Sequence, residues 1–441
     1  MVSTTPAFNL KAVLKETGLT ADTLRAWERR YGLPVPQRTA GGHRLYSQRD
    51  IETIKWLMKR QAEGLSISRA VDMWNEQLSS GADPLAGSAQ GTLVSASTIP
   101  AQYAFDTTLD ALRMGWIEDC LNFSESSSEQ ILNQAFSMFP VEVVCIEILQ
   151  RGISEIGNLW YENRASVQQE HFASSLAMRR LDALLASSAP PTRNQSVLVG
   201  CPAEEWHTLT PLLLSLLLRR RGLNVIYLGA NVPTEQFSNT VKNIKANLVV
   251  LVAQQLITAA TLQQTALALS SQNIPIAFGG RIFEVHFGLE ESIPGHFLGN
   301  ILGTAVENIE ILLSEKIKQQ PLKAASPVYV TTHQAYISKR TQIELTFKEL
   351  LEPLSISPED IRTGIYFLGE NITAALQLGD MSYVSTEIDW LKGLLQTHGS
   401  PEGQLVNFMQ TYSQAVNQNI KGQGKPVIEW LTAEVEKVKA S

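Results

Sequence analysis

Apolar residues recur at two different spacings along this chain, and the change between them divides it into predicted domains. Leu10, Val13 and Leu14 fall on one face of a helix, and helical spacing returns over residues 109–185. Over residues 196–313, short apolar runs alternate with apolar helices instead. The pattern predicts an all-helical unit over 1–78, a four-helix bundle over 101–190, an α/β domain over 191–320 and an all-α extension over 326–441.

Five apolar runs in the α/β region are short enough to be strands that are buried on both faces. In chain order they read SVLVGC, NVIYLGA, NLVVLVAQ, IPIAFGG and HFLGN, and helical segments separate them. This alternation predicts a doubly wound parallel sheet of the Rossmann-like kind. Because ligands of such sheets bind at the carboxyl ends of the strands, we expect a site in the loops that follow these runs.

Composition and charge place contact with nucleic acid at the N-terminus. The 441 residues carry a net charge of −7, but residues 1–80 hold 12 Lys or Arg against 8 Asp or Glu. The remainder is acidic, so only the head has the charge that suits DNA. Residues 79–100 are rich in Gly, Ser and Ala and predict a flexible linker.

The cysteines and the apolar runs exclude several other classes of protein. Three well-separated cysteines without a CxxC pair give no disulfide framework and no zinc site. The N-terminus lacks the features of a signal peptide, and the longest apolar run is too short to cross a bilayer. We therefore expect a cytoplasmic protein without a membrane partner.

Arginine is unusually dense in the run LRAWERRYGLPVPQRTAGGHRLYSQRDI, which starts at Leu24. A scattered arginine is normally a solvated charge, but this density beside a Gly-Gly turn favours a nucleic-acid interface. The rings of Trp27, Tyr31 and Tyr46 can either form a small core or face a DNA backbone.

The same run resembles the winged helix-turn-helix of MerR-type transcriptional regulators. The resemblance implies a recognition helix over Thr20–Arg30 and a wing over Arg38–Tyr46, with Arg44 and Tyr46 on phosphates. It also implies dimers on near-palindromic operators, and because the linker replaces the usual pairing helix, assembly must come from the body. The DNA-contacting residues expected from it are Thr20, Arg25, Trp27, Arg29, Arg30, Arg38, His43, Arg44 and Tyr46.

In the predicted bundle, Trp160 precedes a polar pair, Glu170–His171, by one loop. Ser166 and Gln169 have the spacing of a capping box, which predicts that the pair lies in the first turn of the next helix. Trp160 and the pair can then cover one pocket. On spacing alone, a core tryptophan and an inconsequential histidine are slightly favoured.

A second candidate group follows the first predicted strand, in CPAEEWHTLT. His207 lies just beyond the carboxyl end of that strand, where an imidazole can be delivered to the metal of a bound macrocycle. Glu205, two residues earlier, can orient that imidazole. By itself, however, a loop histidine is usually of no consequence.

The order of these features resembles the cobalamin-binding module shared by methionine synthase-type proteins and CarH-type photoreceptor regulators. The resemblance implies that His207 is the cobalt ligand and that the nucleotide tail lies beside Gly279 and Gly280. It places Trp160, Glu170 and His171 on the upper, adenosyl side. Adenosylcobalamin is the implied cofactor, bound between the bundle and the sheet.

Three positions depart from the pattern of that module. Thr210 replaces a glycine of the D/E-x-H-x-x-G loop, and Gln254–Gln255 stand where a Ser or Thr usually follows the third strand. Tyr161 occupies the place of a second histidine that photosensory relatives often carry.

These features predict a non-enzymatic DNA-binding regulator whose oligomeric state, a dimer or tetramer, and operator affinity are controlled by cobalamin. The alternative is a degenerate module controlled by another ligand or a protein partner, which Thr210 and the glutamines favour. A cobalamin-dependent enzyme is the weakest interpretation. The extension over 326–441 predicts a bundle that stabilises an oligomer, with a partner-docking module or a second ligand pocket as alternatives.

Overall fold

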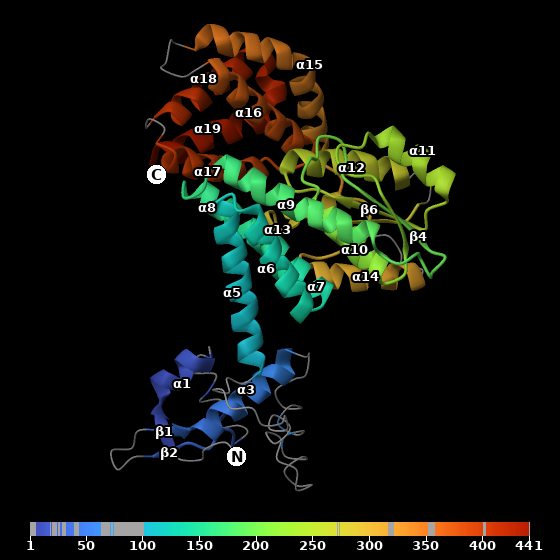
Figure 1. Cartoon of the computed structure of the whole chain (residues 1–441). Coiled ribbons are helices and arrows are strands. Elements are labelled where there is room, and N and C mark those ends of the chain that lie inside the picture. Colours follow the sequence, from blue (N-terminus) through green and yellow to red (C-terminus); the bar gives the residue numbers. More distant parts are fainter. Residues whose placement is uncertain are drawn as a thin grey trace. The chain divides into compact units, whose positions relative to one another are not determined.

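The chain forms two compact units, Met1–Phe105 and Asp106–Ser441, in a computed structural model (Figure 1). Within the described residues, no helix is both long and apolar enough to span a bilayer. The structure describes residues 6–440 except 18, 20–23, 25–26, 29–31, 39–43, 63–70, 72–73, 75–100, 271, 273, 316–321, 352–357 and 400–402. The predicted linker over 79–100 therefore lies outside the described residues.

The apolar pattern predicted an all-helical first unit, but this unit also contains a small antiparallel sheet with the strand order β1–β3–β2. Strands of two to four residues are too short to give a periodic signal, so the pattern revealed only the helices. Its elements are β1 (Pro6–Asn9), α1 (Leu10–Thr17), β2 (Gln37–Arg38), β3 (Arg44–Ser47) and α3 (Gln48–Ala62).

The four predicted helical segments follow over residues 101–186, and the boundary between the two units falls within the first of them. The third segment is continuous but changes from α-helical to π-helical hydrogen bonding and back. Helix α9 starts as the sequence predicts, because Ser166 and Gln169 form a complete capping box. The segments are α5 (Ala101–Leu121), α6 (Glu125–Met138), α7 (Val141–Val144) running through π-helical Cys145–Gln150 into α8 (Arg151–Tyr161), and α9 (Val167–Ala186).

The five predicted strands form one parallel sheet in the order β5–β4–β6–β7–β8. The chain reverses its direction of winding between β4 and β6, and such a switch point is where ligands bind in open α/β sheets. The strands are β4 (Ser196–Gly200), β5 (Asn224–Tyr227), β6 (Leu248–Val252), β7 (Ile276–Gly279) and β8 (His296–Phe297).

Helices cover both faces of this sheet, so the central strands β4, β6 and β7 are buried on both sides, whereas the edge strands β5 and β8 are partly exposed. Alternate residues of β4 point into two different cores: Val197 and Val199 join that of the bundle, whereas Leu198 faces α12. The covering helices are α10 (Leu209–Arg220) and α14 (Leu302–Ser314) on one face, and α11 (Thr234–Ile244) and α12 (Leu256–Ser270) on the other. Short α13 (Ile282–Val285) follows β7.

The C-terminal extension is helical, as predicted, and shares a core with the sheet domain. Helix α16 packs on α12, which is therefore buried nearly all round (Figure 1). The extension contains α15 (Pro327–Leu350), α16 (Pro358–Leu378), α17 (Ser382–Thr397), α18 (Gln404–Ile420), the 3₁₀ turn Lys421–Gly424 and α19 (Lys425–Ala440).

Candidate functional site

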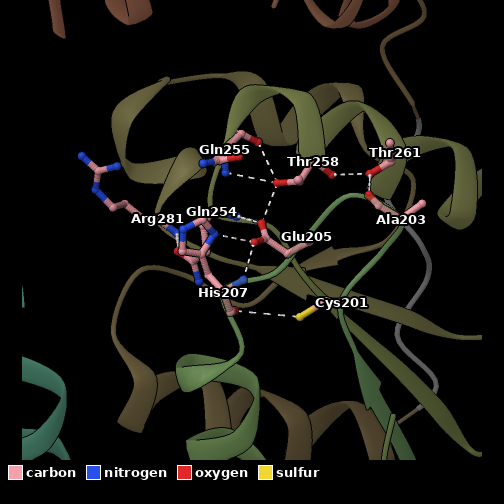
Figure 2. Close-up of polar contacts among 9 residues, drawn as sticks. All are labelled: Cys201, Ala203, Glu205, His207, Gln254, Gln255, Thr258, Thr261 and Arg281. Carbon is pink, nitrogen blue, oxygen red and sulfur yellow. Dashed lines mark hydrogen bonds and ion pairs between the residues drawn. The ribbon is translucent and has the colours of Figure 1, made fainter. Parts of the chain in front are cut away.

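A buried carboxylate links the loops after β4 and β6, the two strands at the switch point (Figure 2). Glu205 has no solvent exposure, and four hydrogen bonds reach its two oxygens. Oε1 accepts from the backbone N–H of His207 at 2.9 Å and contacts its ring Nδ1 at 2.7 Å. Oε2 accepts from the backbone N–H of Gln254 and from the Thr258 hydroxyl, both at 2.6 Å.

These bonds keep the Glu205 carboxylate ionised despite its burial. Burial alone raises the pKa, but the hydrogen bonds from His207, Thr258 and the backbone more than offset it, so the pKa is lowered. A buried anion that is fully hydrogen-bonded is a rigid anchor, because every displacement breaks a charge-assisted bond. The anchor fixes the loop that carries His207.

The His207 ring is oriented by Glu205 and still reaches solvent. Its hydrogen bond to Glu205 raises the pKa of the imidazole, although burial opposes the increase. The side chain is 58% exposed, and Nδ1 is engaged by Glu205, so Nε2 is the nitrogen presented to a ligand. A carboxylate that holds one ring nitrogen while the other faces outward is the usual arrangement of a metal-ligating histidine.

His207 lies on the wall of a cavity of about 590 Å³ between the helical bundle and the sheet. The cavity extends from polar groups at the strand ends to apolar side chains of α10, β6 and α14. Its lining comprises Gln150, Ile153, Ser154, Trp160, His207, Leu209, Thr210, Leu214, Val250, Val252, Gln254, Gln255, Gly279, Gly280, Arg281, Glu284, Leu298, Gly299, Asn300, Ile301, Leu302, Ala305 and Trp390.

Thr210 and Gln254–Gln255, two of the three positions that depart from the module's pattern, line this cavity, whereas Tyr161 is not among its described lining residues. Thr210, in the first turn of α10, and Gln254 both form part of its wall. The Gln254 side-chain oxygen accepts from the backbone N–H of Arg281, which holds that amide against the loop after β7 (Figure 2). This hydrogen bond holds the Gln254 side chain along the loop, so the glutamine leaves space in the cavity.

Gly280 is needed where the loop after β7 crosses β6. Its φ is +130°, and a Cβ would lie 1.8 Å from the Ala253 carbonyl oxygen. Gly299, after β8, has φ +83° but no atom within 4 Å of a Cβ, so a side chain there would enter open space beside the cavity. Gly280 therefore permits a close approach of two backbone segments, whereas Gly299 leaves the space beside the cavity free.

On the helical side, the structure separates the three residues that the sequence grouped. Trp160, near the end of α8, lines the cavity. Among the described lining residues, neither Glu170 nor His171 is present: the His171 side chain is 70% exposed, and Glu170 accepts from Ser174 Oγ at 2.6 Å. The Glu170 charge still adds to the pKa increase that Glu205 causes in His207.

Among the residues of the site that sequence reasoning missed, Thr258 and Trp390 matter most to its geometry. Gln254–Gln255 stand where a Ser or Thr usually follows the third strand. Thr258, in the first turn of α12, supplies such a hydroxyl instead. A threonine at the start of the helix after the third strand was the available signal. Trp390, on α17 of the extension, lines the cavity beside Trp160, and no local pattern announced it.

In the first unit, two of the expected DNA contacts have internal roles. Trp27 and Tyr46 are buried, so the core alternative holds for both rings. The Tyr46 hydroxyl donates to Glu28, and burial with this bond raises the pKa of the phenol. A buried Tyr46 cannot contact a phosphate, which corrects that expectation. Arg44 stays partly exposed and pairs with Glu28 at 2.8 Å. Thr20, Arg25, Arg29, Arg30, His43 and the Arg38 side chain lie outside the described residues.

Three family models match the chain in the predicted order. Residues 8–77 match the MerR HTH family regulatory protein, and residues 115–185 and 195–305 each match a B12 binding domain. The helix-turn-helix domain implies DNA binding, and the other two make up a cobalamin-binding module. Residues 326–441 lie outside all three matches.

Similar proteins include two repressors from Myxococcus xanthus. HTH-type transcriptional repressor CarH is 27% identical over 299 residues, covering 67% of this chain and 95% of that protein. HTH-type transcriptional repressor CarA is 27% identical over 244 residues, covering 55% and 75%. Among solved structures, the Methanosarcina barkeri monomethylamine corrinoid protein has 16% identity and a TM-score of 0.41, covering 47% of this chain and 99% of that one.

Proposed function

We propose that this chain, a MerR-type transcriptional regulator with a cobalamin-binding module, changes its oligomeric state and operator affinity according to the cobalamin it holds. The observation that carries the proposal is the Glu205–His207 pair on the wall of the cavity between bundle and sheet. Adenosylcobalamin, when bound, would supply a light-sensitive cobalt–carbon bond. The alternative signals, another ligand or a partner protein, are outcomes of the same experiments.

The residues of the cavity fit such a cofactor. His207 would hold the cobalt through Nε2, because Glu205 engages Nδ1 and holds the ring in one orientation. The apolar depth of the cavity, at Leu214, Val250 and Ala305, supports entry of a nucleotide tail beside Gly279 and Gly280. Trp160 lines the helical side, where the upper ligand is expected.

Control of DNA binding would follow from linkage between cofactor and assembly. One helix-turn-helix head makes few contacts, whereas several heads held in one assembly gain from effective concentration. A ligand that contacts both bundle and sheet stabilises the arrangement it fits, so it shifts the population of that arrangement. We expect residues 1–80 alone to bind DNA selected by the full chain far more weakly than the full chain does, and equal affinities would contradict this.

The decisive experiment is an absorbance spectrum. The full chain is incubated with adenosylcobalamin in the dark and passed through gel filtration, before and after illumination. We expect cobalt absorbance to co-elute with the protein and the elution volume to change with light. A protein peak without cobalt absorbance would refute cobalamin binding, and a light-independent elution volume would refute the light response alone.

A pair of histidine variants identifies the ligand. His207→Ala removes the ligating nitrogen, so the spectrum of the bound cofactor should shift to that of a form without protein imidazole. His171→Ala is the matched control, because its ring is exposed and lies outside the cavity lining. An unchanged spectrum in His207→Ala, or the same shift in both variants, would refute the assignment.

A further inference from the structure

Among the described lining residues of the cavity, one comes from outside both B12 binding domains. Trp390 lines it from α17, in the part of the chain beyond residue 305 where the module's matches end. Its indole is 37% exposed and lies 6.5 Å from that of Trp160, measured between ring centroids. Two large aromatic side chains from different domains therefore stand together on the helical side of the cavity.

A junction between the ends of α8 and α17 holds Trp390 there. The Tyr161 ring stacks on Trp390 with centroids 5.9 Å apart and an interplanar angle of 30°. The Tyr161 hydroxyl donates to the Trp390 carbonyl oxygen at 3.2 Å, and His398 Nε2 lies 3.3 Å from the Trp160 carbonyl oxygen. The residue after Trp160 is thus turned away from the cavity and onto the extension.

Gly393 lets the two helices approach this closely. A Cβ at this position would lie 2.0 Å from the Tyr161 hydroxyl oxygen, so any larger residue must displace the Tyr161 ring or α17 itself. Alanine has a higher helix propensity than glycine, and a glycine inside a helix is disfavoured unless packing requires it. The required packing here is the contact that positions Trp390.

We propose that Trp390 is a specificity-determining residue, which together with Trp160 selects cobalamins that carry a flat aromatic group on the upper axial position. Indole rings offer broad apolar faces that stack on an adenine, whereas a methyl or hydroxyl group is too small to contact both rings. The C-terminal extension is accordingly part of the ligand site. This inference rests on the proposed function, since it concerns the same cavity.

The test compares two cofactors in the full chain. Dissociation constants for adenosylcobalamin and methylcobalamin are measured in the dark, and their ratio expresses the preference for the adenosyl group. We expect Trp390→Ala to weaken adenosylcobalamin binding about tenfold and methylcobalamin binding less than about threefold, and Trp390→Phe to restore most of the preference. Trp430→Ala is the control for damage to the extension, because Trp430 lies on α19 outside the cavity lining.

A second pair of variants tests the junction while keeping Trp390. Gly393→Ala should reduce the adenosyl preference about threefold and should also change tryptophan fluorescence in the cofactor-free protein. Gly157→Ala is the matched control, a glycine of α8 whose Cβ would meet no atom within 4 Å.

The outcomes separate this inference from the proposed function. If the wild-type chain binds neither cobalamin, the proposed function fails and the inference fails with it. If both cobalamins bind and the ratio is the same in wild type and Trp390→Ala, the inference alone is overturned. An equal loss of preference in Trp430→Ala would also overturn it, since general damage to the extension would then explain the effect.

Discussion

The two walls of the cavity are built in opposite ways. On the sheet side, one buried carboxylate receives four hydrogen bonds and fixes His207 to the loop after β6. On the helical side, the partly exposed rings of Trp160 and Trp390 are tilted against each other, and Tyr161 stacks on Trp390. Only single polar contacts, from Tyr161 and His398 to backbone carbonyls, support this arrangement. The sheet-side wall suits a metal ligand that stays in place. The helical-side wall suits the part of the cofactor that changes, because the contacts that hold this wall together are individually weak.

This comparison predicts that the sheet-side wall is the sensitive one. Glu205→Ala leaves the Gln254 N–H, the Thr258 hydroxyl and His207 without their acceptor in a buried place. We expect the free energy of unfolding to fall by about 3–5 kcal/mol and cobalamin affinity to fall about 10–100-fold. Urea unfolding of the full chain and equilibrium binding measure the two effects.

The control for this change is Glu205→Gln, which keeps the shape but replaces one acceptor oxygen with a donor. It should fall between wild type and Glu205→Ala in both measurements. If alanine at 205 costs less than about 1 kcal/mol, the carboxylate is not the anchor of this wall.

Gly280→Ala should have the next largest effect. The new Cβ would meet the Ala253 carbonyl at 1.8 Å and would be placed on a residue with φ +130°. Strain and displacement of β6 together should destabilise the fold by about 2–4 kcal/mol, seen as a lower urea midpoint. Gly299→Ala, with φ +83° and free space, should cost only about 1 kcal/mol. If both variants lose the same amount of stability, the structure relieves the contact between the new Cβ at position 280 and the Ala253 carbonyl.

Thr258→Val tests a single bond of the same wall. It removes a donor to Glu205 Oε2 and the acceptor for the Gln255 N–H without changing the side-chain volume much. A loss of about 1–2 kcal/mol in the free energy of unfolding is expected, and Thr258→Ser, which keeps the hydroxyl, should lose less. A more stable valine variant would show that this hydroxyl does not support Glu205.

The fold was predictable where each element has a strong local signal. The central strands β4, β6 and β7 lie in largely apolar runs because both of their faces are buried, and the capping box at Ser166 predicted the start of α9. The sheet β1–β3–β2 was missed because two to four residues cannot show periodicity. Strands β5, β7 and β8 are equally short but lie in apolar runs that alternate with helices, so the presence of such a run, rather than strand length, decided which strands the pattern revealed.

Only those contacts of the site that lie within a single loop could be predicted from the sequence. Glu205 and His207 are two residues apart, so their contact follows from the sequence of one loop. Thr258 joins them because the sheet order places β6 beside β4, and Trp390 joins Trp160 because the extension docks on the bundle. Both contacts depend on tertiary structure that periodicity does not encode. The Glu170–His171 pair lies in the predicted helix turn but outside the described cavity lining, and its position along the chain did not show this.

The helical wall should tolerate a small change, and Tyr161→Phe is the mildest one. It removes the partly exposed hydrogen bond to the Trp390 carbonyl and keeps the ring that stacks on Trp390. Because water replaces a lost exposed bond, the free energy of unfolding should fall by only about 0.5 kcal/mol. Cobalamin affinity should stay within about twofold of wild type, since a change below about 0.4 kcal/mol is a factor of two.

The contrast with Thr258→Val then gives the comparison its sharpest form. Both variants delete one hydroxyl, but one hydroxyl belongs to a buried carboxylate network and the other to a partly exposed junction. If Tyr161→Phe costs as much as Thr258→Val, the helical wall is held as rigidly as the sheet wall. The idea that the helical wall adjusts to its ligand would then have no physical basis, because the contacts of this wall would be as strong as those of the sheet wall.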